Sequence, residues 1–331
     1  MDMEDLLRDL RSDERFARKF LLNSVLGLLP AAGEIGGEGT NRIYKSMGED
    51  AAAIEIRDKY ILVSTDMISP SLIKENPESA GYSAILVGID DIYASGGHPI
   101  TCTIEVQAGS SSTIKQVMQG AARASRHFAV PICRGHTSLQ ESGPALSCTV
   151  IGEIDKEFYV SAGGAVPGDI IILIWDPDGR KSKIGPYWDT VSMKTSSEIQ
   201  YRLHTMIELA GKKLLQAAKD VSNSGVLGTT YMMLNYSQAG GRIDIGNIKQ
   251  IFSCRSKKDL YWWLMAYLTN AFVVTAKASD LPAIQAACSL QQLKANQIGT
   301  VNEGSILFLE YDGQSHPFLD WTKQPVLPDR T

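Results

Sequence analysis

Cysteine is scarce in this sequence, with five residues in 331 and no CxxC pair. Neither a disulfide framework nor a zinc knuckle is therefore expected. An excess of basic residues is also missing: 32 Lys and Arg stand against 37 Asp and Glu, and a net charge of −5 argues against nucleic acid as a partner. No apolar run reaches the roughly 18–20 residues of a membrane span, and the acidic N-terminus lacks a signal-peptide pattern. We expect a cytoplasmic protein that binds neither nucleic acid nor membranes.

Length and composition indicate two domains, because 331 residues suit two cores of about 150 residues each. Apolar residues recur at helical spacing over 2–29, and residues 31–39 then contain four glycines. A second glycine-rich stretch, 161–168, precedes a strongly apolar run. We predict an α+β fold of the α/β sandwich type, with a helical extension at 1–32, an N-terminal domain at 33–157 and a C-terminal domain at 158–331.

Strand and helix patterns alternate along both halves. The first half predicts strands at 52–56, 60–63, 100–106 and 148–152 and helices at 77–95 and 112–128. The second half predicts strands at 169–175, 271–275 and 305–309 and helices at 195–219 and 258–270. We expect three lysines of helix 195–219 to face solvent, namely Lys212, Lys213 and Lys219. The aromatic run 261–263 is expected to pack in the core, and His98 and His136 are expected in loops.

Aspartates stand where several of these predicted elements end, at Asp50, Asp66 and Asp91. Each one alone can be explained as a helix cap or a turn residue. Gathered together, however, carboxylates repel one another unless a cation lies between them. All-oxygen ligation suits Mg²⁺, which proteins bind through one or two carboxylates together with substrate phosphates. The three aspartates therefore form a candidate magnesium site.

The glycine-rich segment is a candidate phosphate-binding loop. Its glycines Gly36, Gly37 and Gly39 allow backbone N–H groups to approach a phosphate closely. The segment is not a P-loop, because the sequence has no GxxxxGK[ST] motif and no GxGxxG after a strand. Together with the aspartates it favours a magnesium-bound nucleotide as the ligand.

An ordered series of motifs resembles the AIR (aminoimidazole-ribonucleotide) synthase superfamily over residues 33–304. After the glycine-rich segment the motifs are GEDAAA, STDM, DDIYASGGHP, GHTS, GGAVPGD and DVSNSG. The resemblance implies a two-domain fold in which the N-terminal domains of two chains pair their sheets into a barrel-like homodimer interface. It also implies that ATP and Mg²⁺ bind in a groove near that interface.

The resemblance also implies roles for individual residues. Asp50, Asp66 and Asp91 match metal-facing positions, and Asp91, Asp220 and His136 are the catalytic candidates. The implied nucleotide contacts are Gly36, Gly37, Gly39, Gly48, Asp50, Thr65, Asp66, Gly135 and Thr137. Four positions depart from the family pattern and imply fewer metal ions: Glu49, Gly88, His136 and Asn223. For His136, a water-exposed turn residue stays an equal alternative.

The expected function is that of an ATP-dependent enzyme. It would transfer the γ-phosphate to an oxygen of a small metabolite, or use it to activate that oxygen, as a kinase or as a ligase or cyclase. The first cysteine is Cys102, and the chain ends in VLPDRT, so the chemistry of the selenophosphate synthetase and hydrogenase-maturation branches is not expected. The alternative is a non-catalytic, nucleotide-binding regulatory or scaffold protein, which the lost acidic positions favour.

Overall fold

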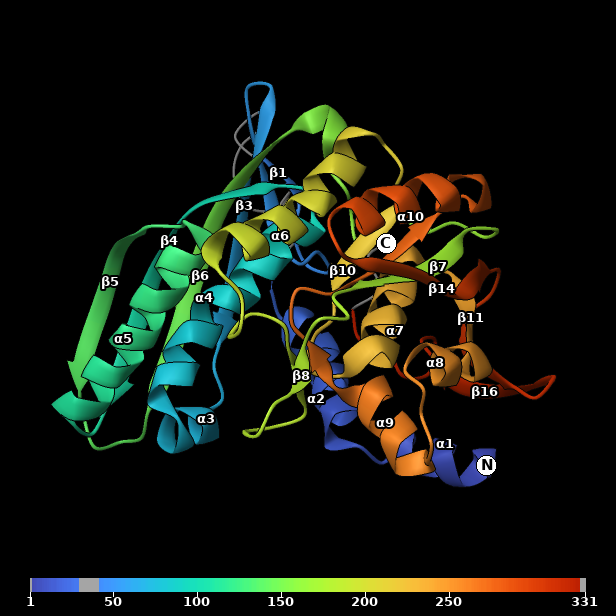
Figure 1. The fold of residues 1–331 in the computed structure, drawn as a ribbon, viewed down its shortest axis with the longest axis horizontal. Coiled ribbons are helices and arrows are strands. Elements are labelled where there is room, and N and C mark those ends of the chain that lie inside the picture. The colour runs from blue at the N-terminus through green and yellow to red at the C-terminus, as the bar shows by residue number, and fades with distance from the viewer. Residues whose placement is uncertain (1, 30–41, 328–331) are drawn as a thin grey trace.

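The computed structural model describes residues 2–29 and 42–327 (Figure 1). The predicted phosphate-binding glycines Gly36, Gly37 and Gly39 lie outside the described residues. Two layered α/β units follow one another along the chain, each built around its own sheet. Within the described part of the chain, no helix combines the length and apolar character that crossing a membrane requires.

The predicted helical extension forms two helices, α1 (Met3–Arg11) and α2 (Glu14–Leu26). Each begins after an aspartate whose carboxylate accepts backbone N–H groups of the first turn, Asp2 for α1 and Asp13 for α2. The buried leucines of α1 join the apolar core of the C-terminal unit. Arg15 of α2 donates to the carbonyl of Met265 at 2.7 Å. The extension is therefore packed against the C-terminal unit, beside α9 (Figure 1).

The N-terminal unit contains a six-stranded sheet in the order β1-β2-β3-β6-β4-β5. Only the pair β4–β5 is parallel among its strand pairs in the described chain. The sheet is open, with β1 and β5 at its edges. Its strands are β1 (Ile43–Lys45), β2 (Ala52–Ile56), β3 (Lys59–Met67), β4 (His98–Ala108), β5 (Ile132–Leu139) and β6 (Ala145–Asp155).

Helices cover one face of this sheet (Figure 1): α3 (Pro70–Glu75), α4 (Pro77–Ala94) and α5 (Ser111–Phe128), with the 3₁₀ turn η2 (Lys156–Phe158) after β6. Two glycines let α4 and α5 cross in backbone contact. A Cβ on Gly81 would lie 1.8 Å from the carbonyl oxygen of Val117, and a Cβ on Gly120 would lie 1.8 Å from that of Glu78. Because any side chain there would clash, these glycines fix the position of α4.

The C-terminal unit contains a seven-stranded sheet in the order β10-β13-β7-β14-β11-β15-β16 and a small sheet β12-β9-β8. Its strands are β7 (Ile170–Trp175), β8 (Arg180–Lys181), β9 (Tyr187–Asp189), β10 (Ala217–Asp220), β11 (Gly240–Asp244), β12 (Tyr267–Leu268), β13 (Phe272–Ala276), β14 (Lys294–Asn302), β15 (Ile306–Tyr311) and β16 (Gln314–Asp320). Its helices are α6 (Ser196–Gly211), α7 (Gly225–Ser237), α8 (Ile245–Ile251), α9 (Lys257–Met265), α10 (Leu281–Leu290) and the 3₁₀ turn η3 (Ala278–Asp280).

Three predictions of local structure are wrong. The helix predicted at 195–219 ends at Gly211, Lys213 adopts a left-handed backbone (φ 54°), and 217–220 forms strand β10. Lys219, predicted to face solvent, is therefore buried. The helix predicted at 258–270 stops at Met265, before β12. His136 and His98 lie in strands β5 and β4, not in loops.

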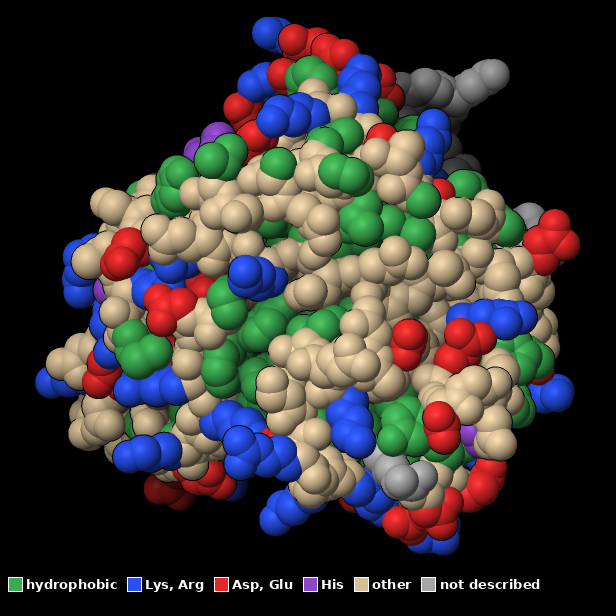
Figure 2. Space-filling view, turned by 45° about the vertical axis from the view of Figure 1, so that its right-hand side comes forward, with side chains coloured by type: hydrophobic (Ala, Val, Ile, Leu, Met, Phe, Trp, Pro, Cys, Tyr) green, Lys and Arg blue, Asp and Glu red, His purple; other side chains and the backbone are tan. Residues whose placement is uncertain are grey.

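The strand predicted at 52–56 has the predicted ends in β2, and the other predicted elements are present with shifted ends. The strands predicted at 60–63, 100–106 and 148–152 extend to 59–67, 98–108 and 145–155, so that Thr65 and Asp66 lie inside β3. The aromatic run packs in the core as predicted, because the ring of Trp263 stacks on Phe252 with centroids 4.0 Å apart. On the face shown in Figure 2, basic and acidic side chains are interspersed and do not form a continuous basic stripe.

Candidate active site

A cavity of about 840 Å³ lies between the two units. One face of α4 lines it. Six residues at helical spacing form this face: Ser79, Tyr82, Ser83, Leu86, Val87 and Asp91. With a rise of 1.5 Å per residue, this face is about 18 Å long. The cavity is therefore elongated, and Asp91 and Ser79 mark its opposite ends.

Four aspartates line the cavity at the Asp91 end, and each comes from a different element. Asp50 precedes β2, Asp66 lies in β3, Asp91 lies in the last turn of α4, and Asp220 ends β10. Carboxylate oxygens of Asp50, Asp91 and Asp220 all lie within 4.8 Å of one another. The structure thus brings two of the three predicted metal residues, Asp50 and Asp91, together with Asp220, while Asp66 lines the same cavity outside this group.

Ser64 connects two of these carboxylates. Its hydroxyl donates to Asp91 Oδ2 and lies 3.3 Å from Asp66 Oδ2. Burial, followed by the charges of Asp66, Asp220 and Asp50, raises the pKa of Asp91 well above its ordinary value. Burial and then the charge of Asp50 raise the pKa of Asp220 in the same way, although Lys219 opposes the shift. In both residues the ionised carboxylate is therefore destabilised by burial and by its neighbours.

The carboxylate of Asp220 is the least satisfied group of the cluster. Its residue is only 6% exposed, and within the described residues its side chain has no hydrogen bond and no ion pair. A buried carboxylate without a partner is costly unless a cation or a donor reaches it. Its oxygens, together with those of Asp66 and Asp91, match the all-oxygen ligation that Mg²⁺ prefers. The residues present therefore fit a magnesium ion.

Two lysines, neither of them predicted as a site residue, line the acidic end of the cavity. The ammonium of Lys219 pairs with Asp50 Oδ1 and lies 3.4 Å from the carbonyl oxygen of Gly48. Burial opposes its charge, but the carboxylates of Asp50, Asp220 and Asp91 together outweigh burial and raise the pKa of Lys219. Lys19, from α2, donates to the hydroxyl of Ser222 at 3.3 Å. Burial lowers the pKa of Lys19, which the charge of Asp220 opposes.

Family models match most of the chain. The description "AIR synthase related protein, N-terminal domain" matches residues 48–154, and "AIR synthase related protein, C-terminal domain" matches residues 167–312. The chain belongs to the AIR synthase related family. The family includes ATP-using kinases and ligases. The matched residues include the aspartate cluster and Lys219, whereas the helices α1 and α2, and with them Lys19, precede the matched residues.

Individual relatives agree with this assignment. An uncharacterized protein of Synechocystis sp. is 31% identical over 281 residues, which cover 85% of each chain. The structure of PurL from T. maritima in complex with ATP superimposes with a TM-score of 0.72 at 14% identity, over 88% of this chain and 49% of PurL. The chain thus spans about half the length of PurL. The structure of AaThiL in complex with AMPPCP and TMP gives a TM-score of 0.61 at 20% identity, over 83% and 91% of the two chains.

The structure shows what two residues that depart from the AIR synthase pattern contact. Gly88 stands where the pattern has Asn, and a Cβ there would lie 2.6 Å from Cγ2 of Val150, so α4 packs directly on β6. Glu49 stands where the pattern has the first Asp of its pair. Its carboxylate accepts the hydroxyl of Ser161 at 2.6 Å and the N–H of Ala162 at 2.7 Å. Glu49 is therefore engaged by the linker between the two sheets.

The GHTS motif of this AIR synthase relative lies apart from the cavity. Gly135, His136 and Thr137 are exposed residues of the edge strand β5, and none of them lines the cavity within the single chain. Of the other predicted nucleotide contacts, Thr65 lines the cavity and its hydroxyl lies 2.9 Å from that of Thr149. Gly48 adopts φ +100° directly before the cluster.

The opposite end of the cavity is formed by α4 and α5. The hydroxyl of Tyr82 lies 3.2 Å from Nδ1 of His127, and the guanidinium of Arg123 lies over the Tyr82 ring, 5.1 Å from its centroid. Arg123 also pairs with Glu78 at 3.1 Å. Burial, then the charges of Arg123 and Arg126, lowers the pKa of His127. This end offers aromatic and hydrogen-bonding groups, in contrast to the acidic end.

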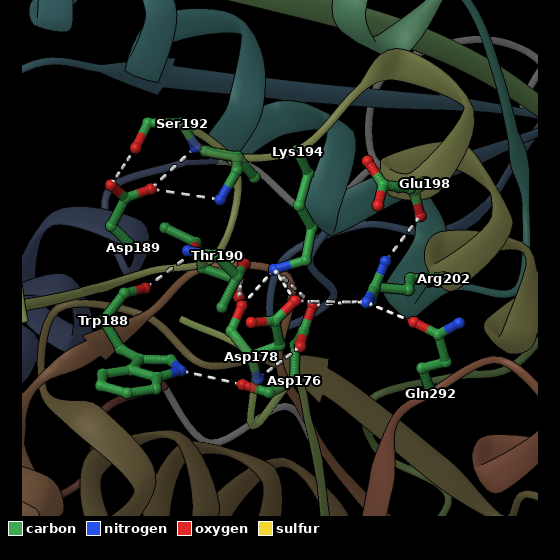
Figure 3. Close-up of polar contacts among 12 residues, drawn as sticks. Asp176, Asp178, Trp188, Asp189, Thr190, Ser192, Lys194, Glu198, Arg202 and Gln292 are labelled. Carbon is green, nitrogen blue, oxygen red and sulfur yellow. Dashed lines mark hydrogen bonds and ion pairs between the residues drawn. The ribbon is translucent and has the colours of Figure 1, made fainter. Parts of the chain in front are cut away.

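A buried ion-pair network holds the segment 189–195 that forms one wall of the cavity (Figure 3). Asp176 Oδ2 lies 3.0 Å from Nε of Arg202 and 3.3 Å from Nζ of Lys194. Asp189 accepts the N–H groups of Val191 and Ser192. Because Lys194 pairs with Asp176 and Asp178, this wall has a defined position next to the cavity.

Proposed function

We propose that this protein is a magnesium- and ATP-dependent enzyme. It transfers the γ-phosphate to an oxygen of a small metabolite, or uses the phosphate to activate that oxygen. The observation that supports this most is the convergence of four aspartates at one end of an elongated cavity between the two units. The ATP-using relatives of the family support the nucleotide part of the proposal.

In this proposal Asp66, Asp91 and Asp220 hold the magnesium ion, and Asp50, whose two oxygens accept from Lys219 and from the N–H of Asp220, lies beside them. When bound, Mg²⁺ supplies neutralisation of the phosphate charge, on which phosphoryl transfer depends. The protein itself supplies positioning. Lys19 presents an ammonium beside the cluster without a carboxylate partner within 4 Å in the described chain, and it is free to contact a phosphate oxygen.

In this proposal a carboxylate of the protein acts as a general base on the acceptor group, and no protein side chain attacks the phosphate as a nucleophile. Asp220 lines the cavity, and an oxygen of its carboxylate that does not contact the metal would accept the proton of a metabolite hydroxyl as that hydroxyl attacks the γ-phosphorus and ADP leaves. Asp91, which Ser64 orients, lies beside it. The apolar residues Leu86 and Val87 and the ring of Tyr82 line the middle and far part of the cavity and exclude water from a bound metabolite. The cavity volume of about 840 Å³ suits small-molecule ligands.

The division into 33–157 and 158–331, a homodimer and a cytoplasmic setting belong to the same proposal. The face of the six-stranded sheet that α4 and α5 leave open would pair with that of a second copy. Exposed apolar side chains on its strands support this pairing: Met67 is 73% exposed, Ile100 41% and Leu139 63%. Pairing there would bring Gly135, His136 and Thr137 of edge strand β5 close to the second copy. Five free cysteines agree with a reducing compartment.

Calorimetry with the ATP analogue AMPPCP, with and without Mg²⁺, tests the binding step. An assay for ADP release in the presence of a panel of metabolites with hydroxyl and carboxylate acceptors tests turnover. Magnesium-dependent binding with ADP release on at least one acceptor is the expected result. Binding without ADP release on any acceptor would favour the non-catalytic nucleotide binder, which the presence of Asn223 in place of an acid at the cavity wall supports. No binding of AMPPCP would refute both functions.

A further inference from the structure

Lys219 lies inside the aspartate cluster, where a cation is needed. Its side chain and that of Asp50 are each 7% exposed, and the two form an ion pair. The carbonyl oxygen of Gly48 lies 3.4 Å from the same ammonium. The electrostatic environment of Lys219 also includes Asp220 and Asp91. An ammonium thus shares the buried space of the carboxylates from which a metal site would be built.

The charges of the cluster decide how many ions it can hold. It contains four aspartates and two lysines, Asp50, Asp66, Asp91, Asp220, Lys19 and Lys219. If all six are ionised, the net charge is −2, which one divalent cation balances. Without Lys219 the net charge would be −3, which a single divalent cation no longer balances, so that a second ion is favoured. Since uncompensated charge in a buried site is costly, the lysines reduce the number of ions that the site favours.

The hydrogen bonds of Asp50 agree with this count. Its Oδ1 pairs with Lys219, and its Oδ2 accepts the N–H of Asp220 at 3.0 Å. Both oxygens of Asp50 are therefore engaged by the C-terminal unit. The carboxylate of Asp220 has no hydrogen bond or ion pair in the described chain and stays available to a ligand. The cluster is thus divided into an aspartate that a lysine neutralises and carboxylates that face the cavity.

We propose that the ammonium of Lys219 takes the place of a second divalent cation, so that the site holds one metal ion per chain. The proposal rests on the proposed function, because it requires that the cluster binds a cation. It goes further in naming the residue that sets the metal stoichiometry. Lys219 neutralises Asp50, so no second metal ion is needed there. Asp91, Asp66 and Asp220 are left to bind the single ion.

The test is a titration of the full chain with Mn²⁺ alone, in which free Mn²⁺ is measured by electron paramagnetic resonance. We expect one bound ion in the wild type and two in Lys219→Met. The double variant Asp50→Asn/Lys219→Met removes one charge of each sign and is expected to bind one ion. Lys212→Met is the matched control, because this exposed lysine pairs with Glu208 outside the cavity, and one ion is expected.

Each outcome separates the two proposals. Two ions in the wild type, or one ion in a folded Lys219→Met variant, would overturn the role of Lys219 and leave the proposed function standing. No bound ion in the wild type would overturn both. If Lys219→Met does not fold, as circular dichroism would show, the wild-type stoichiometry and the charge-matched double variant still decide, because the proposal requires one ion in each.

Discussion

Replacing Asp91 with Asn should stabilise the metal-free protein while weakening its ligand binding. Asp91 is 8% exposed, and its carboxylate lies within 4.8 Å of those of Asp50 and Asp220. Two unit charges at that distance repel by about 3 kcal/mol at an effective dielectric constant of 20. Partial protonation reduces this repulsion, so we expect a gain of about 1–3 kcal/mol in the free energy of unfolding near pH 8. Asn keeps an oxygen that can accept the hydroxyl of Ser64.

The pH dependence of that gain has a definite sign. The pKa of Asp91 in the folded chain lies above its ordinary value. The folded chain therefore binds more protons than the unfolded chain, and its stability falls as the pH rises above the unfolded pKa of Asp91. Asn does not titrate, so the advantage of the variant should be smaller at pH 5 than at pH 8. Chemical denaturation in EDTA at both pH values measures it.

The same variant should respond differently to ligand. Adding Mg²⁺ and AMPPCP should raise the melting temperature of the wild type through binding to the folded state, and the rise should be smaller in Asp91→Asn. A variant that is less stable than the wild type in EDTA at pH 8 would refute the claim that the carboxylates repel one another. An unchanged response to Mg²⁺ and AMPPCP would refute the role of Asp91 at the metal.

Three further variants test other parts of the site. Asp66→Asn should weaken AMPPCP binding at least about tenfold in the presence of Mg²⁺ and much less in EDTA, as calorimetry would show; equal losses in both buffers would contradict a role at the metal. Lys19→Met should weaken AMPPCP binding about tenfold, whereas Arg18→Met, on the exposed side of the same helix, should not. Asp176→Asn should lower the free energy of unfolding by about 3–5 kcal/mol because it removes the buried carboxylate that Lys194 and Arg202 share and leaves them only the exposed Asp178. Asp178→Asn, at a side chain that is 72% exposed, should cost under about 1 kcal/mol, and similar losses in the two variants would speak against the buried network.

The aspartate motifs could be found from the sequence because each one follows a local rule. Asp50, Asp66 and Asp91 stand near the ends of elements whose apolar patterns are clear, and the chain order of the motifs matched a known family. Once the fold is predicted correctly, the proximity of these aspartates follows from it. The two-domain α/β architecture followed from the same patterns, which the two family matches confirm.

The lysines could not be found in this way. The stretch 212–219 has a helix-like composition, but the strand β10 forms there because its backbone pairs with β13 and its residues are buried. Only that tertiary contact buries Lys219. Its position directly before DVSNSG was the one available signal. Lys19 approaches the cluster because α1 and α2 pack against the C-terminal unit, a contact between segments about 200 residues apart that periodicity does not encode.

The edge strand β5 was missed for a related reason. Its residues 133–137 are exposed, and glycine interrupts them, so no alternation of apolar and polar residues marks them as a strand. The strand exists because its backbone pairs in parallel with β4. At Gly135 the two backbones approach closely, because a Cβ there would lie 2.4 Å from the carbonyl oxygen of Ile104. Glycine there is a packing requirement, which a turn interpretation of the motif could not reveal.

The position of Lys19 on an appended helix has an evolutionary consequence. The helices α1 and α2 precede the residues that the family models match, yet two residues of α2, Lys19 and Leu22, line the cavity. Mutations in this short leading segment can therefore alter the charge that a ligand meets without disturbing either sheet. A lineage could acquire a new reactant by exchanging its first thirty or so residues while its metal-binding scaffold stays unchanged.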